Sequence, residues 1–177
     1  MQQSFTHLNV SSAYSLRYGT ALPEKIVERA SFHNFSKIAL TDKDTMSGAI
    51  NFVHNCMIHG ITPIVGVNFN LGKSRALVLA RGKNGWKDLC RLVSSAHEKE
   101  RGKPLLDVSK LWQKMQQGNL VAILGIDSEI GQSVLRNRID LANSFLKNWL
   151  THVDKGDLVI EVSAHPNLHK VSDPRYS

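Results

Sequence analysis

The side chains of this chain that could support hydrolytic or metal chemistry are its eight histidines, fifteen acidic residues and two cysteines. No two histidines form an HxH or HExxH pair, the spacings that bring two imidazoles to one metal ion. Ser11 and Ser12 lie near His7, but no sharp glycine-flanked turn marks either serine as a nucleophile. Cys56 and Cys90 lack the CxxC spacing of a zinc site. The spacing of these residues alone therefore defines no catalytic centre.

The charge balance of the chain favours an acidic partner. The net charge is +7, and the sequence pI is about 9.6. Such a surface suits contact with DNA, although a solvated basic surface without a partner is the alternative. No apolar run approaches the ~20 residues of a membrane span, so we expect no membrane contact. Two cysteines in helical patterns indicate reduced thiols and predict a cytoplasmic location.

Hydropathy patterning predicts an α/β fold. Short apolar or alternating runs predict strands at residues 5–10, 37–41, 63–69, 76–80, 119–124 and 157–162. Helical spacing predicts helices at residues 23–34, 47–59, 84–97, 107–115 and 140–150. This alternation predicts a mostly parallel sheet, either open or closed into a barrel. A closed barrel usually needs a longer chain than 177 residues, so we expect an open sheet or a fragment of a longer polypeptide.

Five segments of the chain carry a resemblance to a known family. They are HLNVSSAYSLRYG (7–19), TDKDTMSGAINF (41–52), GITPIVGVN (60–68), RALVLARGKNGWKDLCRLVSSA (75–96) and, more weakly, GNLVAILGIDSEIG (118–131). Together they resemble the PHP (polymerase and histidinol phosphatase) domain that opens the alpha subunit of bacterial DNA polymerase III. The resemblance implies a distorted (β/α)7 TIM-like barrel, incomplete here at its C-terminal end. Residues 1–163 would form a single domain, and 164–177 a tail or a truncated next βα unit.

The resemblance also places the family's metal ligands on seven positions of this chain. Two histidines fall on Asn9 and Ser11, an aspartate on Tyr18, histidines on Lys43 and Arg75, a glutamate on Asn68 and a cysteine on Gly125. Metal ions such as zinc and manganese need carboxylate, imidazole or thiolate ligands, which these residues do not supply. We therefore expect a vestigial site that binds no metal.

Residues around these seven positions carry further expectations. His7 and Asp42 are candidate remnants of the ligand set, although each is more simply a structural residue. Lys43 and Arg75 bring positive charge to the place of the metals, and Coulomb repulsion opposes cation binding there. We expect both cations to fill the old cavity through ion pairs with Asp42 or Asp44.

The resemblance implies an indirect function. The chain would be the N-terminal PHP domain of a DNA-directed DNA polymerase that acts in replication, itself non-catalytic and either structural or partner-docking. The implied partners are the polymerase body of the same polypeptide, a proofreading exonuclease subunit and DNA. One alternative is a metal-dependent phosphoesterase or 3′–5′ exonuclease that uses zinc or manganese. Another is a stand-alone adaptor for replication proteins.

Overall fold

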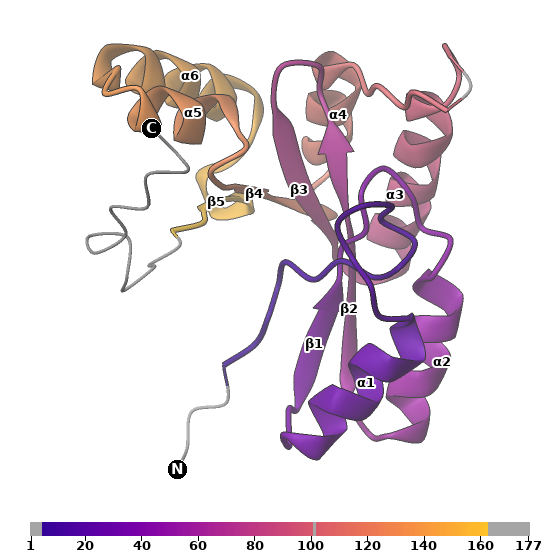
Figure 1. Ribbon diagram of the computed structural model, residues 1–177. Coiled ribbons are helices and arrows are strands. Elements are labelled where there is room, and N and C mark those ends of the chain that lie inside the picture. The colour runs from indigo at the N-terminus through magenta and orange to yellow at the C-terminus, as the bar shows by residue number, and fades with distance from the viewer. Residues whose placement is uncertain (1–4, 101, 163–177) are drawn as a thin grey trace.

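The computed structural model describes residues 5–100 and 102–162, and a five-stranded sheet forms its centre (Figure 1). The strands lie side by side in chain order: β1 (Lys37–Leu40), β2 (Thr62–Asn70), β3 (Arg75–Ala80), β4 (Leu120–Leu124) and β5 (Leu158–Ile160). The β1/β2 and β4/β5 pairs are parallel, whereas β2/β3 and β3/β4 are antiparallel. Four strands therefore run in one direction, and β3 alone is reversed.

The reversal of β3 corrects the expectation of a mostly parallel sheet, since only two of the four pairings are parallel. The link between β2 and β3, residues 71–74, is a tight turn in which Leu71 N–H donates to the Ser74 carbonyl at 2.9 Å. A parallel crossover needs about a dozen residues or more, so a link this short forces an antiparallel hairpin. Gly72 takes a φ of 98° in this turn, a conformation that favours glycine.

Six α-helices connect and flank the strands. They are α1 (Pro23–Phe32), α2 (Ala49–Ile58), α3 (Gly82–Ala96), α4 (Val108–Met115), α5 (Glu129–Leu135) and α6 (Ile139–His152), and a 3₁₀ turn (Lys155–Asp157) precedes β5. The predicted helices are confirmed to within a few residues. The carboxylate of Asp107 caps α4 by accepting from Ser109 N–H at 2.9 Å, as its position before the helix suggests. The seven-residue α5 was missed because it is too short to show a helical period.

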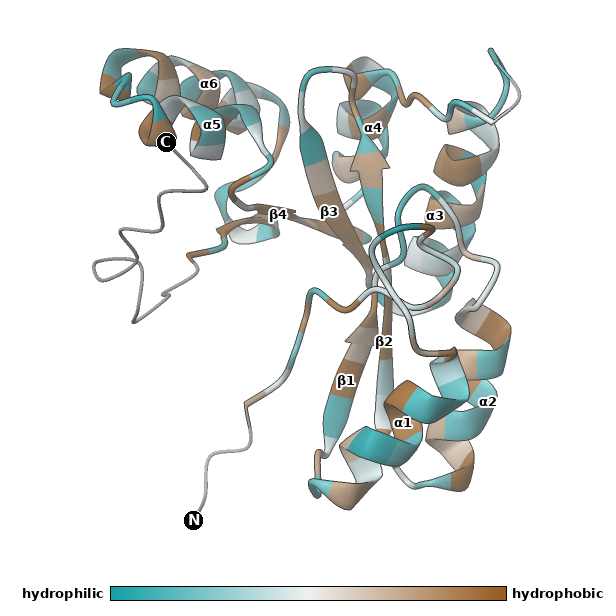
Figure 2. Ribbon diagram, viewed as in Figure 1, coloured by the Kyte–Doolittle hydropathy of each residue, from teal (hydrophilic) through white to brown (hydrophobic). Residues whose placement is uncertain are grey.

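The two faces of the sheet have different roles, and β3 illustrates the division. Ala76 and Val78 join the large core beneath α3, α4, α5 and α6, whereas Leu77 and Leu79 form a small cluster on the opposite face with Ile123. Alternate residues of a strand point to opposite faces, so this pattern follows from the sequence. The helices thus cover one face, and the middle of the sheet is apolar (Figure 2).

The strand expected at residues 5–10 is wrong. This segment runs beside β1, but only two backbone hydrogen bonds join them: Ala39 N–H donates to the His7 carbonyl at 3.0 Å, and Thr41 N–H to the Val10 carbonyl at 2.9 Å. The acceptors are three residues apart and the donors two, so one extra residue on the N-terminal side interrupts a regular ladder. Residues 164–177 lie outside the described part of the chain. Within the described residues, no helix combines the length and apolar character needed to cross a bilayer.

Candidate functional site

The polar ends of several strands meet at one edge of the sheet. Because β1, β2, β4 and β5 run in one direction and β3 in the other, the ends of those four strands share an edge with the start of β3. Asp42 follows β1, Gly125 follows β4 and Glu161 follows β5, while Arg75 opens β3. Ligands of open α/β sheets bind at such an edge. We therefore examine the side chains there first.

Arg75 sits in a dense polar network, here called the arginine clamp (Asp44, Asn68, Asn70 and Arg75). Its Nη2 donates to Asp44 Oδ2 at 2.6 Å, and its Nε donates to Asn68 Oδ1 at 3.0 Å. The backbone N–H of Asn70 donates to the other oxygen of Asp44 at 2.5 Å. Both oxygens of this buried carboxylate are therefore satisfied. The expected ion pair of Arg75 with Asp44 is confirmed.

Asp42 sits in a second network, here called the serine clamp (Ser12, Ser15 and Asp42). Its Oδ1 accepts from Ser12 N–H at 2.7 Å and from Ser15 Oγ at 2.6 Å, and its Oδ2 accepts from Ser12 Oγ at 2.7 Å. Ser15 Oγ in turn accepts from Lys43 N–H at 2.9 Å. All three residues of the clamp are buried. Asp42 thus fastens the loop at residues 12–19 to the end of β1.

Lys43 does not make the ion pair expected of it. Its Nζ lies 3.1 Å from the centroid of the Tyr18 ring, a close cation–π contact. No ion pair of Lys43 occurs within residues 5–100 and 102–162. The reason is that both nearby carboxylates are already committed, Asp42 to the serine clamp and Asp44 to Arg75. The exposed Tyr18 ring offers the remaining electron-rich surface.

Four of the seven proposed vestigial positions line one small cavity. Asn9, Asn68, Arg75 and Gly125 surround about 40 Å³, together with residues that include Glu161. Asn9 Nδ2 donates to both carboxylate oxygens of Glu161, at 3.3 and 3.1 Å. Glu161 also lies close to Gly125, where an added Cβ would lie 2.5 Å from Glu161 Oε2. A space this size has room for about one water molecule.

Other positions lie at or outside this cavity. Tyr18 and Lys43 line a larger neighbouring cleft of about 330 Å³, which Arg75 shares. Ser11 is half-buried and lines neither space. The ring of His7 contacts Phe5 and Phe35, with centroids 4.9 and 5.3 Å away, so His7 belongs to an aromatic cluster and not to the site. Sequence reasoning missed Glu161, although its position directly after a strand was a usable signal.

The side chains present do not suit a zinc or manganese ion. The cavity offers amides and a guanidinium where such an ion needs several anionic or imidazole ligands. Among the described residues, no group of three or more His, Cys, Asp or Glu side chains is placed to hold a metal ion. The arrangement is better suited to holding its own charges in place than to activating water.

Comparison with known proteins defines the class. The fold is that of an α/β domain with a polar site at the strand ends, and the chain belongs to the PHP domain family, whose model matches residues 7–165. Over 91% of its length the chain is 31% identical to the DNA polymerase III subunit alpha of Borreliella burgdorferi, covering 15% of that protein. It is 36% identical to the error-prone DNA polymerase of Symbiobacterium thermophilum over 53% of the chain and 9% of that protein. The chain thus spans a small part of these relatives.

A solved structure shares the fold. A protein from Bifidobacterium adolescentis, described as a proposed metal-dependent phosphoesterase, superposes with a TM-score of 0.60 at 12% identity, covering 88% of this chain and 76% of that one. The family match and this likeness confirm the expected fold, an incomplete TIM-like PHP barrel. They also confirm the resemblance to DNA polymerase III alpha subunits.

Proposed function

We propose that this chain is a metal-free, non-catalytic PHP domain of a DNA polymerase III alpha-type polypeptide that acts in DNA replication, and that its role there is structural or partner-docking. The observation that carries the proposal is the ion pair between Arg75 and Asp44 at a position where the family places a metal ligand. The two side chains are 20% and 10% exposed, so the charges are largely removed from water.

The arginine clamp explains how a PHP site can be stable without a metal. A guanidinium beside the cavity repels any divalent cation, and this repulsion is strong where few water molecules screen it. The same guanidinium neutralises the carboxylate of Asp44, which would otherwise be buried without a counter-charge. Arg75 therefore both opposes metal binding and takes over the charge compensation that a metal would supply.

An apolar patch at the β5 side supports docking to the rest of the polypeptide. Ile126, Val134, Leu135, Ile160 and Val162 are all exposed, and they line a hollow of about 300 Å³ between α5 and the ends of β4 and β5. Contiguous exposed apolar surface of this kind marks an interaction site. Curated relatives such as the Borreliella subunit extend far beyond the region matched here, so we propose the polymerase body as the occupant.

Docking of the patch can be tested in the longer polypeptide. Leu135→Asp is expected to loosen the contact and to raise protease sensitivity near α5, because a charge would be buried against apolar surface. Ile50→Asp on α2, which is also exposed, is the matched control. Equal protease sensitivity of the two variants would contradict this contact.

A proofreading exonuclease subunit and DNA are further proposed partners. The net charge of +7 supports contact with DNA, and such binding should weaken steeply as salt rises. Affinity that does not change with salt would count against phosphate contacts.

The metal-free proposal is tested by elemental analysis. The purified chain is dialysed with zinc or manganese, then against metal-free buffer, and its metal content is measured together with nuclease activity on single-stranded DNA. We expect metal content well below one ion per chain and no activity that a chelator abolishes. One ion or more per chain, with chelator-sensitive activity, would establish the phosphoesterase alternative instead.

A double variant serves as the matched comparison. Lys43→His with Arg75→His returns imidazoles to two family ligand positions and removes both repelling charges. If it remains folded by circular dichroism, it should retain more zinc than the parent chain. A parent chain that retains as much zinc as the double variant would contradict a role for these cations in excluding metal.

A further inference from the structure

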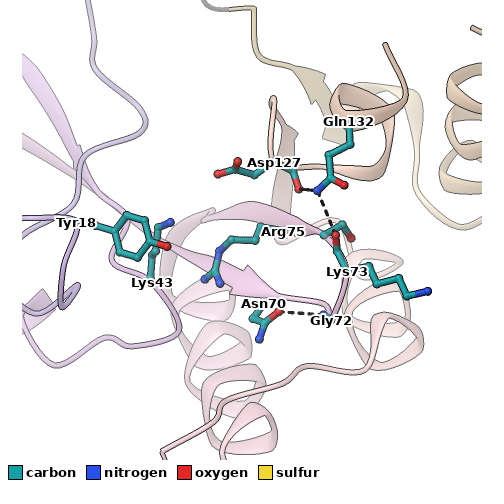
Figure 3. Close-up of a pocket in the computed structure, with 9 residues that line it drawn as sticks. Tyr18, Lys43, Asn70, Gly72, Lys73, Arg75, Asp127 and Gln132 are labelled. Carbon is teal, nitrogen blue, oxygen red and sulfur yellow. Dashed lines mark hydrogen bonds between the residues drawn. The ribbon is translucent and has the colours of Figure 1, made fainter. Parts of the chain in front are cut away.

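The cleft next to the vestigial positions gathers positive charge. It encloses about 330 Å³ and is here called the cation cleft, with Tyr18, Lys43, Lys73, Arg75, Asp127 and Gln132 among its lining residues (Figure 3). Three of these side chains are cations and one is a carboxylate. The volume is at the small end of ligand pockets, which span roughly 300–1,000 Å³. It suits a small anionic group with part of its attached molecule.

Two of the cations are held in place before any ligand arrives. The Lys43 ammonium rests on the ring of Tyr18, and the Arg75 guanidinium is fixed by Asp44 and Asn68. Pre-ordered donors lower the entropy cost of binding. The third cation, Lys73, is exposed at the rim, where its side chain extends away from Arg75 in Figure 3. Rotation of this flexible side chain is enough to bring it over the cleft.

Arg75 retains a free donor group towards a ligand. Its Nε and Nη2 are engaged by Asn68 and Asp44, but within the described residues no hydrogen-bond acceptor meets Nη1. At the far side of the cleft, Gln132 Nε2 is held by the carbonyls of Lys73 and Asp127, at 3.1 and 3.2 Å. Asp127 itself is exposed and opposes anion binding, so the cations determine the selectivity only if they lie closer to the ligand.

We propose that the cation cleft binds a phosphate ester oxyanion directly, without a metal ion. This inference rests on the proposed metal-free function, because it assigns to Lys43, Lys73 and Arg75 the charge that metals would otherwise offer to phosphate. Ammonium and guanidinium groups both bind phosphate oxygens through charge-assisted hydrogen bonds. A phosphate, with more charge and more acceptor oxygens than a carboxylate, makes fuller use of three cations.

The test is a titration of the 177-residue chain in the presence of a chelator, followed by amide NMR shifts and by calorimetry. The probes are inorganic phosphate, a short oligothymidylate with a terminal phosphate and the same oligomer with hydroxyl ends, with acetate at equal ionic strength as the control anion. We expect saturable binding that shifts the amides of Lys43, Gly72 and Gln132. Lys43→Met should weaken binding about tenfold, the loss expected of one charge-assisted hydrogen bond.

Lys83→Met is the matched control, because Lys83 is an exposed lysine of α3 outside the cleft. Equal weakening by both substitutions, or binding of acetate as tight as phosphate, would overturn the proposal. Preference for the phosphate-ended oligomer supports the cleft and assigns its ligand to a strand end. Preference for inorganic phosphate supports the cleft with a free oxyanion.

The outcomes also separate this inference from the proposed function. If no probe binds with the chelator present, and the chain holds no metal, the cleft proposal fails while the metal-free domain stands. If phosphate binds only after manganese is added, and manganese is retained, both proposals fail together.

Discussion

Asp42 and Asp44 stand two residues apart after β1, and the chain satisfies these two buried carboxylates in opposite ways. Asp42, 2% exposed, accepts only from the neutral donors of Ser12 and Ser15. Asp44, 7% exposed, has a full counter-charge in Arg75 and one backbone donor from Asn70. The serine clamp fastens the N-terminal loop, and the arginine clamp fastens the β2–β3 hairpin.

The difference shows which part of a PHP site depends on charge. Hydrogen bonds from hydroxyl and amide groups are enough for Asp42, which contacts a loop of its own half of the sheet. Asp44 faces positions that the family uses for metal, and there the chain supplies a cation. Loss of the metal therefore asks for replacement of charge on the hairpin side, and for nothing on the loop side.

The largest effect is expected from breaking the arginine clamp. Arg75→Met leaves the carboxylate of Asp44 buried without its counter-charge, so the free energy of unfolding should fall by about 3 kcal/mol. Urea denaturation followed by circular dichroism measures this loss. Adding Asp44→Asn to Arg75→Met should recover part of it, because the uncompensated charge is then gone. A double variant less stable than Arg75→Met would show that the pair acts by packing and not by charge.

Breaking the serine clamp should cost less. Asp42→Asn keeps the shape of the side chain and one acceptor oxygen but loses the charge, so we expect a loss of about 2 kcal/mol in the free energy of unfolding. Hydrogen exchange should also become faster at the Ser12 amide, which donates to Asp42. Asp154→Asn, an exposed carboxylate before the 3₁₀ turn, is the matched control. If Ser12 exchange stays slow in Asp42→Asn, the loop is held by something other than this clamp.

Much of this contrast was visible in the sequence, and the missing part has a physical reason. The strands and longer helices follow from periodicity, and the pairing of Arg75 with Asp44 follows from placing a cation beside carboxylates. The contact of Lys43 with Tyr18 did not follow, because it depends on Asp42 being already satisfied by serines 27 and 30 residues away along the chain. Non-local competition for one carboxylate has no short-range signal.

Two other features escaped prediction for related reasons. The segment at residues 5–10 alternates like a strand, but its pairing with β1 is irregular by one residue, which only the three-dimensional register reveals. Glu161 contacts Asn9 from 152 residues away, so neither residue indicates the other. The division of the chain at residue 163 remains a prediction.

The smallest effect is expected where a cation and a ring meet at the surface of the site. Lys43→Met keeps the length of the side chain but removes the charge over Tyr18, so the free energy of unfolding should fall by about 0.5–1 kcal/mol. Tyr18→Leu should cost a similar amount, and the Lys43→Met/Tyr18→Leu variant should cost less than the sum of the two. Additive losses would mean that the contact does not stabilise the fold. The small effect matters for the larger contrast: Lys43 is then free to serve ligand binding, while Arg75 serves both binding and stability.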